Sequence, residues 1–206
     1  MRPRSCRHQP ARQPHPVVPL LLAAVLFSAS QIVLADDEPP AWVVDARQRA
    51  QALGGQLKQA LTGAIEQDGL VAAVEVCQIQ APTIADGVST ESMRVGRTAL
   101  RVRNPANAAD AWERRILEDF EHQMASGKDP AGLEVIAIRH VDGQRQGHWM
   151  SAIPTGGMCL SCHGSSLDPE LQQTIDERYP QDRATGFEPG SLRGAFRVRF
   201  DLPDSD

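Results

Sequence analysis

The sequence predicts an α+β fold, and three observations carry the prediction. Apolar residues recur at intervals of three and four between positions 42 and 80, as they do along one face of a helix. After position 90, apolar and polar residues alternate over several short runs, which is typical of half-buried strands. An Asp-Gly pair separates two of these runs and indicates a hairpin, so we expect an antiparallel sheet.

The first helix is predicted at residues 42–67. Gly54-Gly55 in its middle lowers helix propensity by about 2 kcal/mol relative to alanine, which allows a kink at that point. Asp68-Gly69 then interrupts the pattern. The sequence therefore predicts a long leading helix that stops before a second one begins.

The second helix is predicted at residues 70–80 and is apolar nearly all round. Such a helix is buried, so Cys77 should point into the core or onto something embedded in it. Ala81-Pro82 is expected to end this helix, because proline disfavours helical geometry in the residue before it.

The later part of the chain predicts the sheet and two more helices. Residues 92–103 indicate one or two short strands, and a helix at 110–124 carries Asp110 and Glu113 at its positive N-terminus. The remaining elements are strands at 133–141 and 144–153 around Asp142-Gly143, a helix at 169–179, a loop at 180–190 and a closing strand at 191–202.

The N-terminus has the features of a secretory signal peptide at residues 1–35. A basic start is followed by an apolar run at 17–27 and by small residues ending at Ala35. The alternative is an uncleaved anchor helix, but Pro19 and several polar residues interrupt the apolar run. We therefore expect export to the periplasm, no membrane span after cleavage, and one mature domain at residues 36–206.

Charge argues against nucleic acid as a partner. The chain has 26 acidic residues and a net charge of −5, and every acidic residue follows position 35. Removing a basic signal peptide makes the mature domain more acidic still. Such a domain is repelled by phosphate backbones and by anionic membrane surfaces.

Cys159-Leu160-Ser161-Cys162-His163 is the attachment signature of a c-type haem. Both thiols can add to the haem vinyl groups from one tight turn, and the adjacent imidazole reaches the iron as proximal ligand. A thiol redox pair would be expected near a βαβ pattern, and a zinc site would need a second pair of ligands. We therefore expect one covalently bound haem c, held by Cys159, Cys162 and His163.

Export places this motif where bacteria attach haem, and it leaves one cysteine to explain. Cys6 belongs to the signal peptide, so the mature chain carries Cys77 and the two cysteines of the motif. With those two bound to haem, Cys77 has no disulfide partner in an oxidising compartment. It is either a small buried apolar residue or a ligand.

Five stretches together resemble a known family. The family was first catalogued as a domain of unknown function and consists of single-haem c-type proteins with a PAS-like fold. Its members occur alone in the periplasm or lumen, or as sensing regions of histidine kinases. The resemblance spans roughly residues 43–200, and its matching stretches are 73–82, 95–100, 103–113, 159–164 and 183–195.

The resemblance implies His163 as proximal ligand, thioether bonds at Cys159 and Cys162, and a Cys77 thiolate as the sixth iron ligand. The rival distal ligands are His140, His148, Met150 and Met158. No kinase, cyclase or HAMP segment is attached, so a signal would pass to a separate partner.

Arginines are candidates for contact with the haem propionates, because guanidinium matches carboxylate geometry. The candidates are Arg97, Arg101 and Arg193, and the alternative is that each is an ordinary surface residue. Trp112 and Trp149 are expected to pack in the core or against haem.

Two function classes follow from these residues. The first is a redox sensor or low-potential electron carrier that keeps both axial ligands. The second is a sensor of CO or NO, in which reduction releases Cys77. A haem enzyme such as a peroxidase is not expected, because it needs an open distal position with an acid–base group. The leading helix also fits a homodimer contact.

Overall fold

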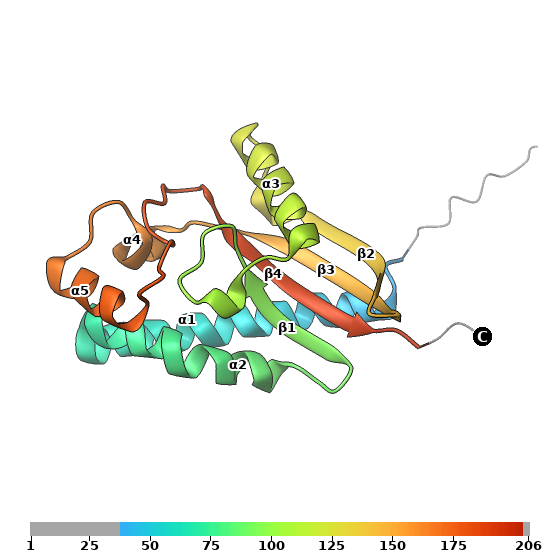
Figure 1. Cartoon of the computed structure of the whole chain (residues 1–206), viewed down its shortest axis with the longest axis horizontal. Helices are drawn as coiled ribbons and strands as arrows, with labels where there is room; N and C mark the ends of the chain where they lie inside the picture. The colour runs from blue at the N-terminus through green and yellow to red at the C-terminus, as the bar shows by residue number, and fades with distance from the viewer. Residues whose placement is uncertain (1–37, 204–206) are drawn as a thin grey trace, which may run out of the picture. The chain divides into compact units, whose positions relative to one another are not determined.

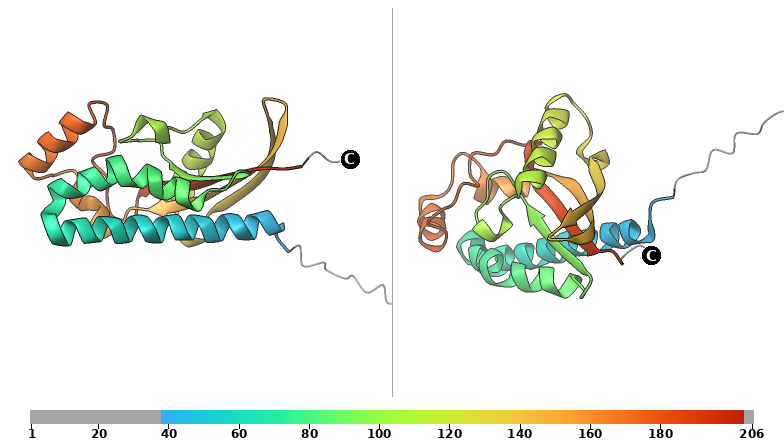
Figure 2. Two further views of the ribbon diagram at one scale, coloured as in Figure 1. Left: turned by 90° about the horizontal axis from the view of Figure 1, so that it is seen from below. Right: turned by 45° about the vertical axis from the view of Figure 1, so that its right-hand side comes forward.

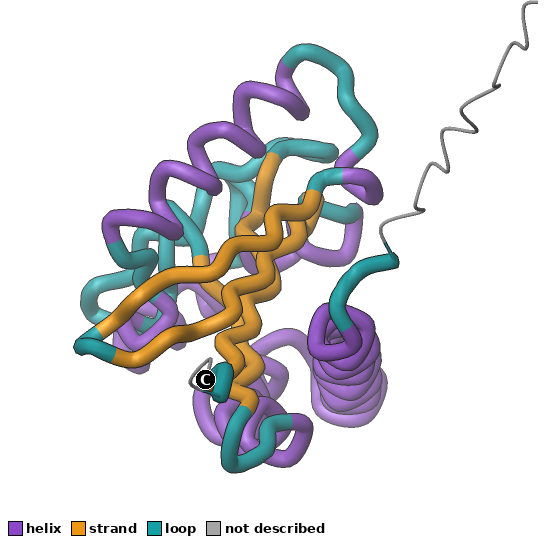
Figure 3. The backbone as a smooth tube through the Cα atoms, turned by 90° about the vertical axis from the view of Figure 1, so that its right-hand side faces the viewer, coloured by secondary structure: helices purple, strands orange, loops and turns teal. Residues whose placement is uncertain are grey.

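The computed structural model describes residues 38–203, which form one four-stranded antiparallel sheet with helices on both faces (Figures 1 and 3). The predicted fold class, α+β with an antiparallel sheet and long N-terminal helices, is confirmed. The signal peptide, its cleavage after Ala35 and Cys6 lie outside the described residues. Within the described part, every helix is too short or too polar to cross a membrane.

The leading helix α1 spans Ala41–Glu75 and changes direction at Gly69. Gly69 has φ 84° and ψ −177°, a conformation that is available almost only to glycine. The segment after it runs back beside the first part of the helix (Figure 2). The break predicted at Asp68-Gly69 is therefore confirmed.

The kink allowed for at Gly54-Gly55 is absent, because both residues are helical. Gly54 instead permits a close approach of helix and sheet. A Cβ atom there would lie 2.9 Å from Cζ of Phe196 on the last strand. The glycine is therefore explained by packing.

The second helix does not end at Ala81-Pro82, so that prediction is wrong. After α1 the chain forms a π-helical turn, η1, at Val76–Gln80, in which the Ala81 N–H donates to the Val76 carbonyl five residues back. It then continues as α2, Ala81–Val88, with Pro82 in the first turn. Proline is tolerated there because the first N–H groups of a helix need no intrahelical acceptor.

The sheet has the order β1-β4-β3-β2, and all its pairs are antiparallel. The turn between β2 and β3 has positive φ at Asp142 (51°) and Gly143 (82°), as the predicted two-residue hairpin requires. The stretch 92–103 supplies one strand. The strands are β1 Met93–Thr98, β2 Glu134–Val141, β3 Gln144–Pro154 and β4 Leu192–Asp201.

Helix α3, Ala111–Ala125, begins with the charge arrangement expected from the sequence. The Asp110 carboxylate accepts hydrogen bonds from the Trp112 and Glu113 N–H groups, and the Glu113 carboxylate accepts one from the Asp110 N–H. This is a capping box.

The core lies on both faces of the sheet. One cluster joins α1 and α2 to the strands, and its larger buried members are Val43, Leu53, Met93, Trp149 and Val198. The other joins α3 to the opposite face, and its larger buried members are Leu117, Phe120, Met150 and Leu192. Trp112 packs against this second cluster, so both tryptophans named above pack in the core.

Two short helices lie beyond one end of the sheet, next to the reversal in α1 (Figure 1). The cysteine motif forms α4, Gly157–His163, where the sequence indicated a turn. Helix α5, Pro169–Arg178, packs on the end of α1 through Leu171 and Ile175, which contact Val74. The single-turn 3₁₀ helices are η2, Pro105–Asn107, and η3, Pro130–Gly132.

Candidate functional site

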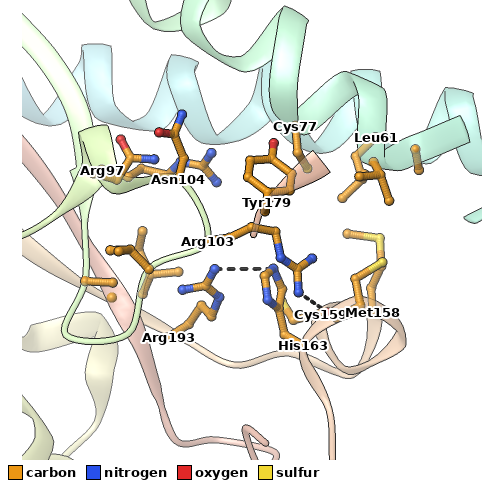
Figure 4. Close-up of a pocket in the computed structure, with 18 of the residues that line it drawn as sticks. Leu61, Cys77, Arg97, Arg103, Asn104, Met158, Cys159, His163, Tyr179 and Arg193 are labelled. Carbon is orange, nitrogen blue, oxygen red and sulfur yellow. Dashed lines mark hydrogen bonds between the residues drawn. The ribbon is translucent and has the colours of Figure 1, made fainter. Parts of the chain in front are cut away.

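A cavity of about 200 Å³ lies where these helices meet the end of the sheet (Figure 4). Its walls come from the second half of α1, η1, the end of β1 with the loop that follows, α4, and the start of β4. Apolar side chains such as Leu61, Ile65 and Val74 form much of the lining. The cavity is therefore built from segments that are far apart in the sequence.

The cavity brings together all four of the predicted sulfur and imidazole groups. Cys159, Cys162 and His163 reach it from α4, and Cys77 reaches it from the π-helical turn η1. The three cysteines are free and partly buried. In Figure 4, Cys77 lies at the helical wall and His163 at the α4 wall.

His163 is held in one tautomer. Its Nδ1 lies 2.6 Å from the Ala184 carbonyl oxygen and donates to it, which leaves Nε2 unprotonated. Burial, followed by the charges of Arg193 and Arg103, lowers the pKa of His163 to about 3, so the ring is neutral at neutral pH. A neutral imidazole with Nδ1–H fixed by a carbonyl is the form in which histidine binds metals.

Two of the three predicted arginines line the cavity. Arg193 donates to Nε2 of His163 over 3.3 Å, and Arg97 lies by η1, close enough to Cys77 for an electrostatic interaction. Burial, ahead of any neighbouring charge, lowers the pKa of Arg97, and it lowers that of Arg193 to about 10. Among residues 38–203, no carboxylate forms an ion pair with either one. The cavity therefore contains two partly buried cations that form no ion pair with a described carboxylate.

Arg101, the third predicted arginine, is not among the residues that line the cavity. Its Nη1 donates to the Thr185 carbonyl over 2.9 Å, and its guanidinium stacks 3.8 Å from the centre of the Phe187 ring. Arg101 instead lines a second, smaller hollow.

Arg103 is a site residue for which the sequence assigned no role. It is 8% exposed, its Nε donates to the Asp182 carboxylate over 3.1 Å, and its Nη2 donates to the Cys162 carbonyl over 2.7 Å. The residue thereby fixes the end of α4 to the loop after α5. No local pattern reveals this role, because its partners are distant in the chain.

The rival distal ligands are also placed. Met158 lines the cavity, whereas His148 and Met150 lie on β3 in the layer under α3. His140 is exposed on the edge strand β2. Of the four rivals, Met158 alone is near the cysteine motif in the described structure.

The chain was compared with known proteins. A family model described as Tll0287-like matches residues 22–201. Among solved structures, the chain is similar to the "cyanobacterial heme-protein Tll0287", with 21% identity and a TM-score of 0.50 over 80% of this chain and 95% of that one. At this identity the likeness concerns the fold. No curated protein matches the chain.

Proposed function

Because the chain belongs to the Tll0287-like family, we propose that it is a c-type haem-binding protein that carries one haem. The family membership confirms the resemblance predicted from the sequence. One observation carries the proposal: a single cavity joins the Cys-x-x-Cys-His motif on α4 to the unpaired Cys77. We place the protein in the periplasm, exported by residues 1–35.

The residues of the cavity fit a haem in three respects. The lining is largely apolar, as a porphyrin requires. The ring of His163 presents an unprotonated nitrogen to the cavity. Arg97 and Arg193 are partly buried at the cavity and form no ion pair with a described carboxylate, and a group with two propionates would supply an anion to each.

Each residue then has a role. The thiols of Cys159 and Cys162 form the thioether bonds, His163 is the proximal ligand, and Cys77 is the distal ligand. The Ala184 carbonyl orients the His163 ring through Nδ1. In this assignment the Arg193 guanidinium no longer contacts Nε2 of His163 and contacts a haem propionate instead.

We assign redox sensing or low-potential electron transfer as the function. Haem iron, when bound, supplies a one-electron couple and a coordination position for small ligands. A thiolate from Cys77 stabilises the oxidised form and lowers the reduction potential relative to a methionine ligand.

Gas sensing is the second candidate, and the π-helical turn favours it. Cys77 lies in η1, Val76–Gln80, where the hydrogen-bonding pattern departs from that of the α-helix. Such turns occur frequently at functional sites. If Cys77 leaves its position on reduction, a diatomic gas such as CO or NO can take its place, and the repacking of η1 is the signal. A separate partner protein would receive that signal or the electron.

The test uses protein produced with the c-type maturation machinery. A pyridine haemochrome assay should report one covalent haem per chain, and the haem should remain after acidic organic extraction. Extraction of all the haem would refute c-type attachment.

The distal ligand is tested by Cys77→Ala. The variant should keep its covalent haem and lose the ferric absorption features of thiolate ligation. Met158→Leu is the matched control, because Met158 lines the same cavity, and its ferric spectrum should equal that of the wild type. An unchanged spectrum for Cys77→Ala would remove Cys77 as ligand.

CO addition to the reduced protein separates the two functions. Electron transfer predicts that the reduced spectrum does not respond to CO. Gas sensing predicts that the wild type binds CO, with Cys77→Ala binding it more tightly because no thiolate competes.

A further inference from the structure

Tyr179 is a buried polar residue of the cavity for which the proposed function has no role. It follows α5, is 7% exposed, and its ring packs with Val74, Leu171 and Ile175. Its backbone groups are hydrogen-bonded, but its hydroxyl has no hydrogen-bond partner among residues 38–203. The hydroxyl oxygen is not one of the fully buried unpartnered side-chain atoms of the described residues, so it opens onto the cavity and can donate to an acceptor there.

The surroundings of Tyr179 indicate which acceptor that is. Tyr179 and Cys77 both line the cavity and lie within electrostatic reach of each other. Arg97 interacts electrostatically with both of them. Figure 4 shows the hydroxyl end of the ring directed toward the helix that carries Cys77. The hydroxyl therefore lies on the wall opposite His163.

The hydroxyl is a donor under ordinary conditions. Burial, followed by the nearby Cys77, raises the pKa of Tyr179, so the group keeps its proton at neutral pH. A thiolate that binds iron retains lone pairs and accepts hydrogen bonds. Cys77 has no hydrogen-bonding side-chain partner among the described residues, so the sulfur and the hydroxyl are complementary.

We infer that the Tyr179 hydroxyl donates a hydrogen bond to the sulfur of Cys77 when Cys77 is the distal ligand, and that this bond sets the reduction potential of the site. The inference rests on the proposed function. Tyr179 is a positioning residue in this scheme, because it acts on iron only through Cys77.

The direction of the effect follows from charge. A hydrogen bond to a thiolate draws electron density from the sulfur, so the sulfur stabilises the oxidised iron less. The hydrogen bond therefore raises the reduction potential and weakens the iron–sulfur bond. Its loss should lower the potential and strengthen that bond.

Tyr179→Phe removes the hydroxyl and keeps the ring that packs on α5. The equilibrium constant for reduction should fall on the order of tenfold, which corresponds to about 59 mV for one electron. The iron–sulfur stretching frequency in the resonance Raman spectrum should rise. Thr174→Ala is the control, because the Thr174 hydroxyl bonds within α5 to the Glu170 carbonyl on the exposed side; it should change neither quantity.

A second perturbation acts in the opposite direction and leaves the packing almost intact. Tyr179 is the only tyrosine in the chain, so biosynthetic incorporation of 3-fluorotyrosine changes this hydroxyl alone. The fluorinated phenol is a stronger donor. The potential should therefore rise and the iron–sulfur frequency should fall.

The outcomes separate this inference from the proposed function. If covalent haem and thiolate ligation are present but neither perturbation moves the potential or the frequency, the inference is wrong and the proposed function stands. If Cys77→Ala leaves the ferric spectrum unchanged, Cys77 is not a ligand and the inference fails with that assignment. Shifts of opposite sign for the two perturbations, both absent in a Cys77→Ala background, would establish the hydrogen bond.

Discussion

His148 should make the stability of this protein depend on pH. The residue lies on β3, is 2% exposed, and its Nε2 has no hydrogen-bond partner among the described residues. Burial, followed by the charges of Arg139 and Arg199, lowers its pKa from 6.5 to about 4, although Asp110 and Glu113 act in the opposite direction. As pH falls below 6.5 the unfolded chain takes up a proton that the folded chain does not, so the free energy of unfolding falls.

The size of the effect follows from the two pKa values. A shift of about 2.5 units corresponds to at most about 3.4 kcal/mol, a limit that is approached only below pH 4. Between pH 7 and pH 5.5, where carboxylates contribute little, His148 should lower the free energy of unfolding by about 1.3 kcal/mol. Urea denaturation at several pH values across this window measures it.

The control is a comparison of two histidine variants. His148→Gln removes the titrating group and should reduce the pH dependence by about 1.3 kcal/mol relative to the wild type. His140→Gln alters an exposed histidine on β2 and should leave the pH dependence as it was. Equal pH dependence in the wild type and in His148→Gln would refute the reasoning.

Two further substitutions test the packing around the sheet and its buried ion pairs. Gly147→Ala places a Cβ atom 2.9 Å from the Trp42 indole and should lower the free energy of unfolding by about 1–3 kcal/mol. Gly132→Ala is the control, because a Cβ atom there meets nothing within 4 Å, and it should not lower the free energy of unfolding. Thermal unfolding measures both variants. Glu113→Gln removes a 1% exposed carboxylate that forms ion pairs with Arg197 and Arg199. Urea denaturation should show that the free energy of unfolding falls by about 3 kcal/mol, near the lower end for a buried pair because both arginines stay partly in water. An unchanged free energy of unfolding would mean that these ion pairs contribute nothing.

Local chemistry made most of the fold predictable from the sequence. The hairpin at Asp142-Gly143 and the start of α3 at Asp110 depend on residues within a few positions of one another. The break at Gly69 is likewise a property of one glycine. Where the signal is local and the backbone requirement is specific, the prediction held.

The wrong predictions are those in which tertiary structure overrides a local signal. Pro82 was expected to end a helix, but the π-helical turn before it places proline at the start of α2, where it is tolerated. Gly54-Gly55 suggested a kink, but Gly54 accommodates Phe196 from a strand at the other end of the sequence. Neither the π-helical turn nor the contact with Phe196 can be identified from the residues next to Pro82 and Gly54 in the sequence.

The candidate site likewise contains residues that the local sequence identifies and residues that depend on distant contacts. The Cys-x-x-Cys-His motif is recognisable because its spacing is a chemical requirement, and the odd number of mature cysteines drew attention to Cys77. Arg103 and Tyr179 could not be found in this way, because their roles depend on the contacts with Asp182 and with the wall around Cys77. Arg101 was a candidate because guanidinium matches carboxylate geometry, a property that does not show which arginines line the cavity.

The assembly of the cavity from distant segments has a consequence for the proposed haem attachment. The motif cysteines are separated by two residues on one helix of seven residues, so their spacing relative to each other is set by the local sequence. The wall around them closes through pairs such as Arg103 with Asp182, which are 79 residues apart and form only when a long stretch of chain has collapsed. The covalent attachment proposed above therefore depends on residues that are near one another in the sequence, whereas the complete cavity, with Cys77 at its wall, depends on the folded domain.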